Sequence, residues 1–173
     1  KGLLISAIRD DDPVIFFEHK LLYDMEGEVP EGEYTIPLGQ ADIKRAGRDV
    51  TVVAIGRMVH IALEAAERLA AGDGVSLEVV DPRTLSPLDE ETIINSVKKT
   101  HHLVVVDEDN PRCSLATDIV ALVTTRAIEY LDGPPQMVTA PHTVVPFSPV
   151  LEDLYIPSPD KVIQAVNAAL GRQ

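Results

Sequence analysis

The sequence contains a single cysteine and no long apolar run, and both scarcities exclude whole classes of protein. Cys113 has no cysteine partner in the chain, so an internal disulfide framework is excluded and a reducing compartment is expected. No apolar stretch approaches the ~20 residues that a membrane-spanning helix requires. We therefore expect a cytoplasmic protein that makes no contact with a membrane.

Basic residues are also scarce relative to acidic ones. There are 15 Lys and Arg against 28 Asp and Glu, which gives a formal net charge of -13. A nucleic-acid partner is excluded because phosphate backbones are bound by basic surfaces. The charge suits an acidic surface that meets a basic partner, although solvated carboxylates explain it equally well.

The hydrophobic pattern beyond residue 50 predicts the fold class. Apolar runs of strand length alternate with segments of helical periodicity, which is typical of a parallel sheet. We expect an α/β fold with three layers, a mostly parallel sheet and helices on both faces. Strands are predicted at 50–56, 75–81, 101–109 and 136–140, and helices at 57–71, from a cap at Ser86 or Asp89 onward, at 114–131 and at 158–171.

The first 50 residues follow a different pattern. Residues 1–9 have the spacing of a short helix, and Pro13–Phe17 is a continuous apolar run that predicts a buried strand. Residues 23–33 hold five acidic residues and no basic ones, which indicates an exposed connector. A short edge strand is expected within 34–50, with a turn at 47–49.

No complete catalytic site can be assembled from the motifs. Gly56 lies where nucleotide-binding turns occur and Arg57 would favour an anion, but the other glycines of that fingerprint are missing, so a plain turn is favoured. Acidic neighbours oppose activation of the Cys113 thiol. His142 follows the last predicted strand, where ligands bind in such sheets, although a packing role in its loop is favoured. No pair of histidines, His19 included, has zinc-site spacing; His60 is interpreted as structural, and His101 and His102 as surface residues.

The aspartate triplet at residues 10–12 has three interpretations. Neighbouring carboxylates can bind a hard cation, but the alternating pattern of a calcium loop is absent. A solvated turn is the default interpretation. In the third, main-chain carbonyls rather than carboxylates hold a cation, and composition does not separate the three.

Long irregular strings then identify a resemblance. "SAIRDDDPVIFFEHK", "DPRTLSPLDEETI" and "PFSPVLEDLYIPSPDKVI" resemble the beta subunits of thiamine-diphosphate-dependent 2-oxo-acid dehydrogenases, in the same order and spacing. "NPRCSLATDI" and "APHTVVPFSPVLED" resemble the acetoin dehydrogenase type most, with the pyruvate and branched-chain types as alternatives.

The resemblance implies that the chain is the C-terminal portion of a longer subunit. Residues 1–20 would be the helix–strand remnant of a pyrimidine-binding domain, 21–47 the acidic connector, and 48–173 a domain like the C-terminal domain of transketolase. Such a portion would hold no catalytic or cofactor-binding residue and would be inactive alone. Thiamine diphosphate and Mg²⁺ would be bound elsewhere in the intact heterotetramer.

The resemblance further implies a role in assembly and docking. In the complex the chain would support cleavage of acetoin and acyl transfer to lipoamide. Its partners would be an alpha subunit, a second beta subunit across a two-fold axis and the basic subunit-binding domain of the lipoyl acyltransferase. A monovalent cation such as K⁺ would be held in part by main-chain carbonyls of Ala7, Ile8, Asp10 and Asp12. A non-catalytic interaction module and a nucleotide-binding domain remain alternatives of other classes.

Overall fold

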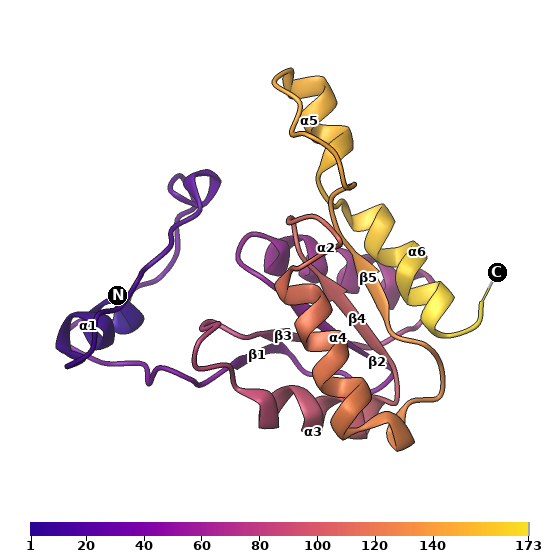
Figure 1. Cartoon of the computed structure of the whole chain (residues 1–173), viewed down its shortest axis with the longest axis horizontal. Helices are drawn as coiled ribbons and strands as arrows, with labels where there is room; N and C mark the ends of the chain where they lie inside the picture. The colour runs from indigo at the N-terminus through magenta and orange to yellow at the C-terminus, as the bar shows by residue number, and fades with distance from the viewer. Residues whose placement is uncertain (173) are drawn as a thin grey trace.

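A five-stranded sheet covered by helices forms the centre of the molecule (Figure 1). The computed structural model describes residues 1–172. The strands are β1 (Asp42–Arg45), β2 (Val50–Ala54), β3 (Leu77–Asp81), β4 (Leu103–Val106) and β5 (Gln136–Val138). Their order in the sheet is β1-β3-β2-β4-β5. β1 runs antiparallel to β3, and the other three pairs are parallel, which confirms the mostly parallel sheet.

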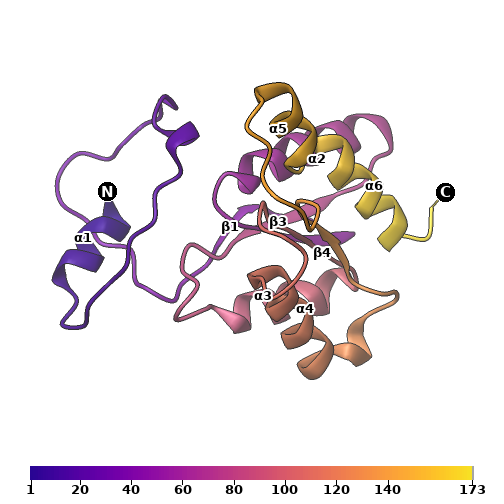
Figure 2. The ribbon, with the colours of Figure 1, turned by 45° about the horizontal axis from the view of Figure 1, so that its top comes forward.

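The helices divide between the two faces of this sheet, as Figure 2 shows. α2 (Met58–Gly72) and α6 (Pro159–Ala169) cover one face, and α3 (Glu90–Thr100) and α4 (Leu115–Arg126) cover the other. A short 3-10 turn, η2 (Ile128–Tyr130), follows α4. The three-layer prediction is thereby confirmed.

Alternation along the central strand divides the core into two halves. All five residues of β2 are buried, since helices cover both of its faces. Val50, Val52 and Ala54 pack toward α2 and α6, whereas Val53 packs toward α3 and α4. The period of two in a strand thus explains how one continuous apolar run serves two hydrophobic layers.

Two helices begin at side-chain caps that the sequence indicates. The Asp89 carboxylate accepts a hydrogen bond from the Thr92 backbone N–H at 3.0 Å and starts α3, so Asp89 rather than Ser86 is the cap. Ser158 caps α6, with Pro159 in its first turn.

The strand predicted at Pro13–Phe17 is wrong. These residues have no regular secondary structure, and Ile15 and Phe17 are 80% and 85% exposed. A strand needs a neighbour for its backbone hydrogen bonds, and within residues 1–172 none pairs with this segment. Only the helix α1 (Gly2–Arg9) and the 3-10 turn η1 (Lys20–Leu22) are regular before β1 among the described residues.

Two further elements, β1 and α5, lie outside the strand and helix ranges that the sequence predicts beyond residue 50. β1 is the expected edge strand and lies inside the predicted connector, and α5 (Pro149–Tyr155) lies in a stretch that we expected to be irregular because of its prolines. Pro149 occupies the first turn of α5, where proline is tolerated in a helix. Among residues 1–172, none of the helices is both long and apolar enough to span a membrane.

Candidate functional site

The best-placed crevice lies beyond the carboxyl ends of β2 and β4. In the sheet, β2 lies between β3 and β4. The connection that follows β2 runs to β3 on one flank of β2, and β4 lies on the other flank. The carboxyl ends of β2 and β4 therefore form a topological switch point. Ligands in open α/β sheets bind at such points. A hollow of about 470 Å³ is present there, formed by Ile55, Gly56, Asp107 and Glu108 of the sheet domain and by residues 17–23 of the N-terminal segment.

A polar side-chain contact joins the N-terminal segment to this crevice. His19 Nε2 lies 2.9 Å from Glu108 Oε1, and His19 Nδ1 accepts a hydrogen bond from the Leu21 backbone N–H at 3.2 Å. Tyr23 donates its hydroxyl to Glu18 at 2.9 Å, and this bond raises the pKa of Tyr23 above its ordinary value. The segment therefore covers part of the switch point with its own side chains.

The carboxylate of Asp107 is buried at the end of β4. Burial raises the pKa of Asp107 above its ordinary value, although Oδ1 accepts a hydrogen bond from the Asp109 backbone N–H at 3.1 Å. Within residues 1–172 no group of three or more His, Cys, Asp or Glu side chains could hold a metal ion. Hence the crevice offers one buried carboxyl and no assembled catalytic set.

Three backbone donors that follow the turn at Gly56–Arg57 are already engaged within the chain. Gly56 has a φ of 56°, which its lack of a side chain permits. The backbone N–H groups of Met58, Val59 and His60 already donate to the carbonyls of Ile55, Gly56 and Arg57. Those three donors are not free for a phosphate, and together with the missing glycines of the fingerprint this favours the plain turn over the nucleotide site.

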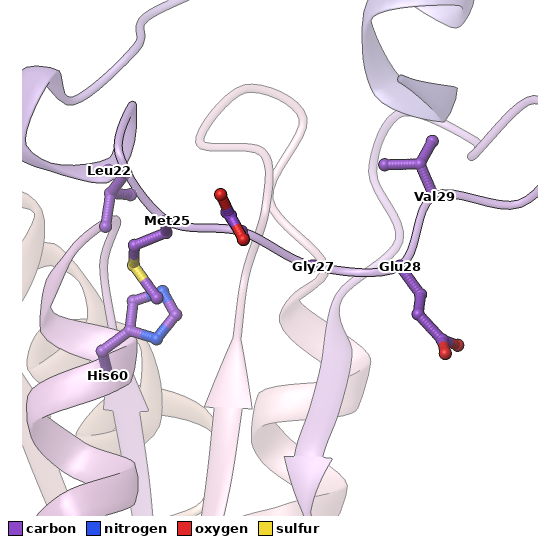
Figure 3. A pocket seen from close by; sticks show the side chains of 7 residues that line it. Leu22, Met25, Gly27, Glu28, Val29 and His60 are labelled. Carbon is purple, nitrogen blue, oxygen red and sulfur yellow. The ribbon is translucent and has the colours of Figure 1, made fainter.

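A second hollow, of about 660 Å³, lies between the connector and the start of α2 (Figure 3). Leu22, Met25 and Val29 line it from the connector, and His60 lines it from α2. Figure 3 shows the Met25 side chain beside the His60 ring. His60, interpreted from the sequence as structural, is exposed and packs against the connector rather than in the core.

The predicted cation segment lies at the end of α1. Ala7 and Ile8 belong to its last turn, where backbone carbonyls have no partner within the helix. Asp10 follows as the C-cap, and its Oδ1 accepts a hydrogen bond from the Asp12 backbone N–H at 2.9 Å. These residues are close together along one chain turn, and the cation site itself stays a prediction.

The other singled-out residues lie apart from the crevice lining. His142 Nδ1 lies 3.3 Å from Asn110 Oδ1, which joins two exposed loops. Cys113 is exposed with a φ of 51°, directly before the cap of α4. His101 ends α3 in a left-handed conformation, with Nδ1 2.8 Å from the Tyr130 carbonyl oxygen.

Residues 39–162 match the family described as "Transketolase, C-terminal domain". The chain belongs to this family. The sheet of this transketolase C-terminal domain is shared with a solved structure, "Split gene transketolase, inactive beta4 tetramer", at a TM-score of 0.70 and 28% identity. That match covers 84% of this chain and 46% of the other.

Curated relatives resemble the chain over nearly its whole length. It is 58% identical over 171 residues to the acetoin:2,6-dichlorophenolindophenol oxidoreductase subunit beta of Bacillus subtilis, covering 99% of this chain and 50% of the relative. The subunit of the same name from Cupriavidus necator is also 58% identical, with 98% and 50% covered. The pyruvate dehydrogenase E1 component subunit beta of Bacillus subtilis is 50% identical, with 98% and 52% covered. The chain spans about half the length of these relatives.

Sequence reasoning missed the two residues that join the N-terminal segment to the transketolase C-terminal domain at the crevice. His19 and Glu108 are 89 positions apart and belong to no recognisable motif. The only available signal was that Glu108 follows a predicted strand, at the sheet edge where ligands and covering segments gather.

Proposed function

We propose that the chain is the assembly and docking part of a beta subunit of an acetoin dehydrogenase complex. The observation that carries the proposal is the 58% identity to two acetoin oxidoreductase beta subunits, against 50% for a pyruvate and 44% for a 2-oxoisovalerate dehydrogenase beta subunit. In the cytoplasmic complex it supports thiamine-diphosphate-dependent cleavage of acetoin and acyl transfer to lipoamide. Residues 1–20 belong to the preceding cofactor domain, and residues 48–173 form the docking domain.

An exposed apolar projection supports an assembly role. We call residues 142–156 the hook, which contains α5 and stands out from the sheet domain in Figure 1. Its apolar side chains that are more than half exposed are Val144, Val145, Phe147, Val150, Leu151 and Leu154. Exposed apolar groups in such number mark contact surfaces for other chains. The alpha subunit and a second beta subunit are the proposed partners.

Hydrogen bonds order the hook: one joins its two ends to each other, and two tie its C-terminal end to α6. Lys161 donates to the backbone carbonyls of Leu154 and Ile156, each at 2.9 Å. The Tyr155 hydroxyl donates to the Thr143 carbonyl at 3.2 Å. A surface ordered before binding loses less conformational entropy when a partner docks.

The acidic surface supports a basic partner. The formal net charge is -13, and the connector adds uncompensated carboxylates at Asp24, Glu26 and Glu28. The basic subunit-binding domain of the lipoyl acyltransferase has the complementary sign, which would accelerate encounter more than it would tighten the complex.

The end of α1 is the proposed position of a monovalent cation such as K⁺. Free carbonyls and the negative end of a helix both attract cations, and Ala7 and Ile8 supply such carbonyls. The carbonyls of Asp10 and Asp12 complete the contribution of this segment. Further ligands from outside it are expected, because a hard cation such as Ca²⁺ takes about six to eight oxygen ligands, more than the four carbonyls of this segment.

Calorimetric titration of the chain with the subunit-binding domain tests the docking role. We expect heat of binding that weakens as salt rises, since screening shortens the reach of charge attraction. An absent or salt-independent signal would contradict docking through acidic groups.

Titration with thiamine diphosphate and Mg²⁺ should give no heat, and tight binding of that cofactor would overturn the assignment of catalysis to other parts of the complex.

A further inference from the structure

The loop between β3 and α3 holds the end of the connector at two backbone amides. The Gly39 N–H donates to the Thr84 hydroxyl oxygen at 3.0 Å, and the Ala41 N–H donates to Asp89 Oδ2 at 2.9 Å. The Thr84 hydroxyl in turn donates to the Pro87 carbonyl at 2.8 Å, which orients its oxygen toward Gly39. Two otherwise unpaired backbone donors of the connector are thus satisfied by side chains of one loop.

A third contact comes from an arginine in a costly conformation. Arg83 has a φ of 58°, in the left-handed region that is unfavourable for a residue with a side chain. Asp81 accepts the Arg83 backbone N–H at 3.0 Å, and the guanidinium reaches Asp42 Oδ2 at 2.6 Å. A strained backbone conformation persists where the surrounding structure imposes it. Here it directs the Arg83 side chain toward Asp42, the first residue of β1.

The carboxylate of Asp89 accepts hydrogen bonds both from the connector and from the first turn of α3. Its Oδ1 accepts the Thr92 backbone N–H at 3.0 Å as the cap of α3. Its Oδ2 accepts the Thr92 hydroxyl at 2.7 Å and the Ala41 N–H at 2.9 Å. The two oxygens of an ionised carboxyl can satisfy all of these donors, whereas the single oxygen of a serine cannot.

Upstream of these contacts, α1 stands apart from the sheet in Figures 1 and 2. It packs instead against the connector, where Ser6 donates to the Ile36 carbonyl at 2.6 Å. The position of α1 relative to the sheet therefore depends on how the residues just before β1 are fixed, together with the contact of His19 with Glu108.

We propose that Arg83, Thr84 and Asp89 form a clamp that fixes the connector on the sheet domain and sets the direction of the segment that precedes it. Through Asp89 the clamp is coupled to the first turn of α3. The clamp does not rest on the acetoin chemistry proposed above, because the hydrogen bonds that define it lie within this chain.

Hydrogen exchange followed by NMR on the whole chain tests the clamp. Asp89→Ser keeps a cap for α3 but leaves Ala41 without its acceptor. We expect exchange of the Ala41 amide to accelerate about tenfold or more, as loss of a bond to a charged acceptor predicts, while the Thr92 amide stays protected. Thr84→Val removes the bond to Gly39 and the bond to the Pro87 carbonyl and leaves Asp89 in place, so the Gly39 amide should accelerate with the cap of α3 unaffected.

Ser158→Ala is the matched control, since Ser158 caps α6 and touches nothing in the connector. It should lower global stability by a similar amount and leave the amides of residues 39–42 as protected as before. Unchanged exchange at Ala41 in Asp89→Ser together with unchanged exchange at Gly39 in Thr84→Val would overturn the clamp. Equal acceleration in Ser158→Ala would also overturn it, because global opening would then explain the effect.

Discussion

Gly47 shows how a single small residue permits the close approach of two parts of the sheet. A Cβ atom at Gly47 would lie 2.1 Å from the Leu77 carbonyl carbon and 2.2 Å from the Glu78 nitrogen. Both are backbone atoms of β3 and cannot move aside as a flexible side chain could. The sequence predicted a turn here, but not that its glycine is required by contact with a strand 30 residues away.

Gly47→Ala should therefore lower the free energy of unfolding by about 1–3 kcal/mol, or prevent folding, because overpacking forces the backbone apart. Gly27→Ala is the control, since nothing lies within 4 Å of its added methyl group. Chemical denaturation of both variants measures the difference. Equal midpoints for the two variants would contradict the close approach.

Glu78 is a buried charge whose stability contribution depends on pH. Its carboxylate is 1% exposed, accepts hydrogen bonds from Ser96 at 2.7 Å and from the Gly47 N–H at 3.2 Å, and pairs with Lys99. Burial alone would raise the pKa of Glu78, but Lys99 and these donors outweigh it and lower the pKa below its ordinary value. Because the folded pKa is depressed, this stabilisation is present above the unfolded pKa of about 4.3 and is lost as pH falls through the folded pKa.

Lys99→Met should lower the free energy of unfolding by about 1–3 kcal/mol at neutral pH, because a buried carboxylate loses its charged partner. The loss should shrink at acidic pH, where Glu78 is protonated. Lys98→Met, the control, removes a lysine that lies 5.2 Å from the Tyr130 ring and should cost less than about 1 kcal/mol. Urea titrations across pH measure both, and a loss for Lys99→Met that does not change with pH would contradict the pairing.

At the scale of elements, periodicity predicted most helices and strands but not their partners. The run 50–56 became β2 because β3 and β4 flank it, whereas Pro13–Phe17, with the same apolar character, remained irregular. Hydrophobicity indicates burial, and strand formation additionally requires a neighbouring backbone. α5 was missed because its prolines suggested a loop, although Pro149 lies where a helix accepts one.

The hook should matter for association and not for folding. Phe147 is fully exposed, so Phe147→Ser should change the free energy of unfolding by no more than about 0.5 kcal/mol. It should nevertheless weaken co-purification with an alpha subunit or a second copy, because an exposed apolar anchor is lost. Ile119→Ala, at a fully buried position, should show the opposite pattern. It should lower the free energy of unfolding by about 2–5 kcal/mol and leave the contact surface of the hook unchanged.

Thermal unfolding and pull-down of these two variants measure the contrast. A large stability loss in Phe147→Ser would mean that the hook is part of the core. Unaltered association in that variant would remove it as a contact surface.

At the scale of the whole molecule, the α/β class, the mostly parallel order and the family followed from the sequence. The site did not, since the crevice is partly covered through the contact of His19 with Glu108 and the connector is held by Arg83, Thr84 and Asp89. These are pairwise contacts between distant positions, and spacing along one chain does not encode them.

A chimeric subunit tests the proposed function most directly. The half of the Bacillus subtilis acetoin oxidoreductase beta subunit that this chain matches is replaced by the chain, and the product is co-expressed with the alpha subunit of that enzyme. Acetoin-dependent reduction of 2,6-dichlorophenolindophenol is then measured, with the matching half of the 2-oxoisovalerate dehydrogenase beta subunit as the control insert. We predict a rate within about tenfold of the natural subunit, a difference of ~1.4 kcal/mol in activation free energy, and a lower rate for the control. A chimera that folds but neither binds the alpha subunit nor reduces the dye would contradict the proposal.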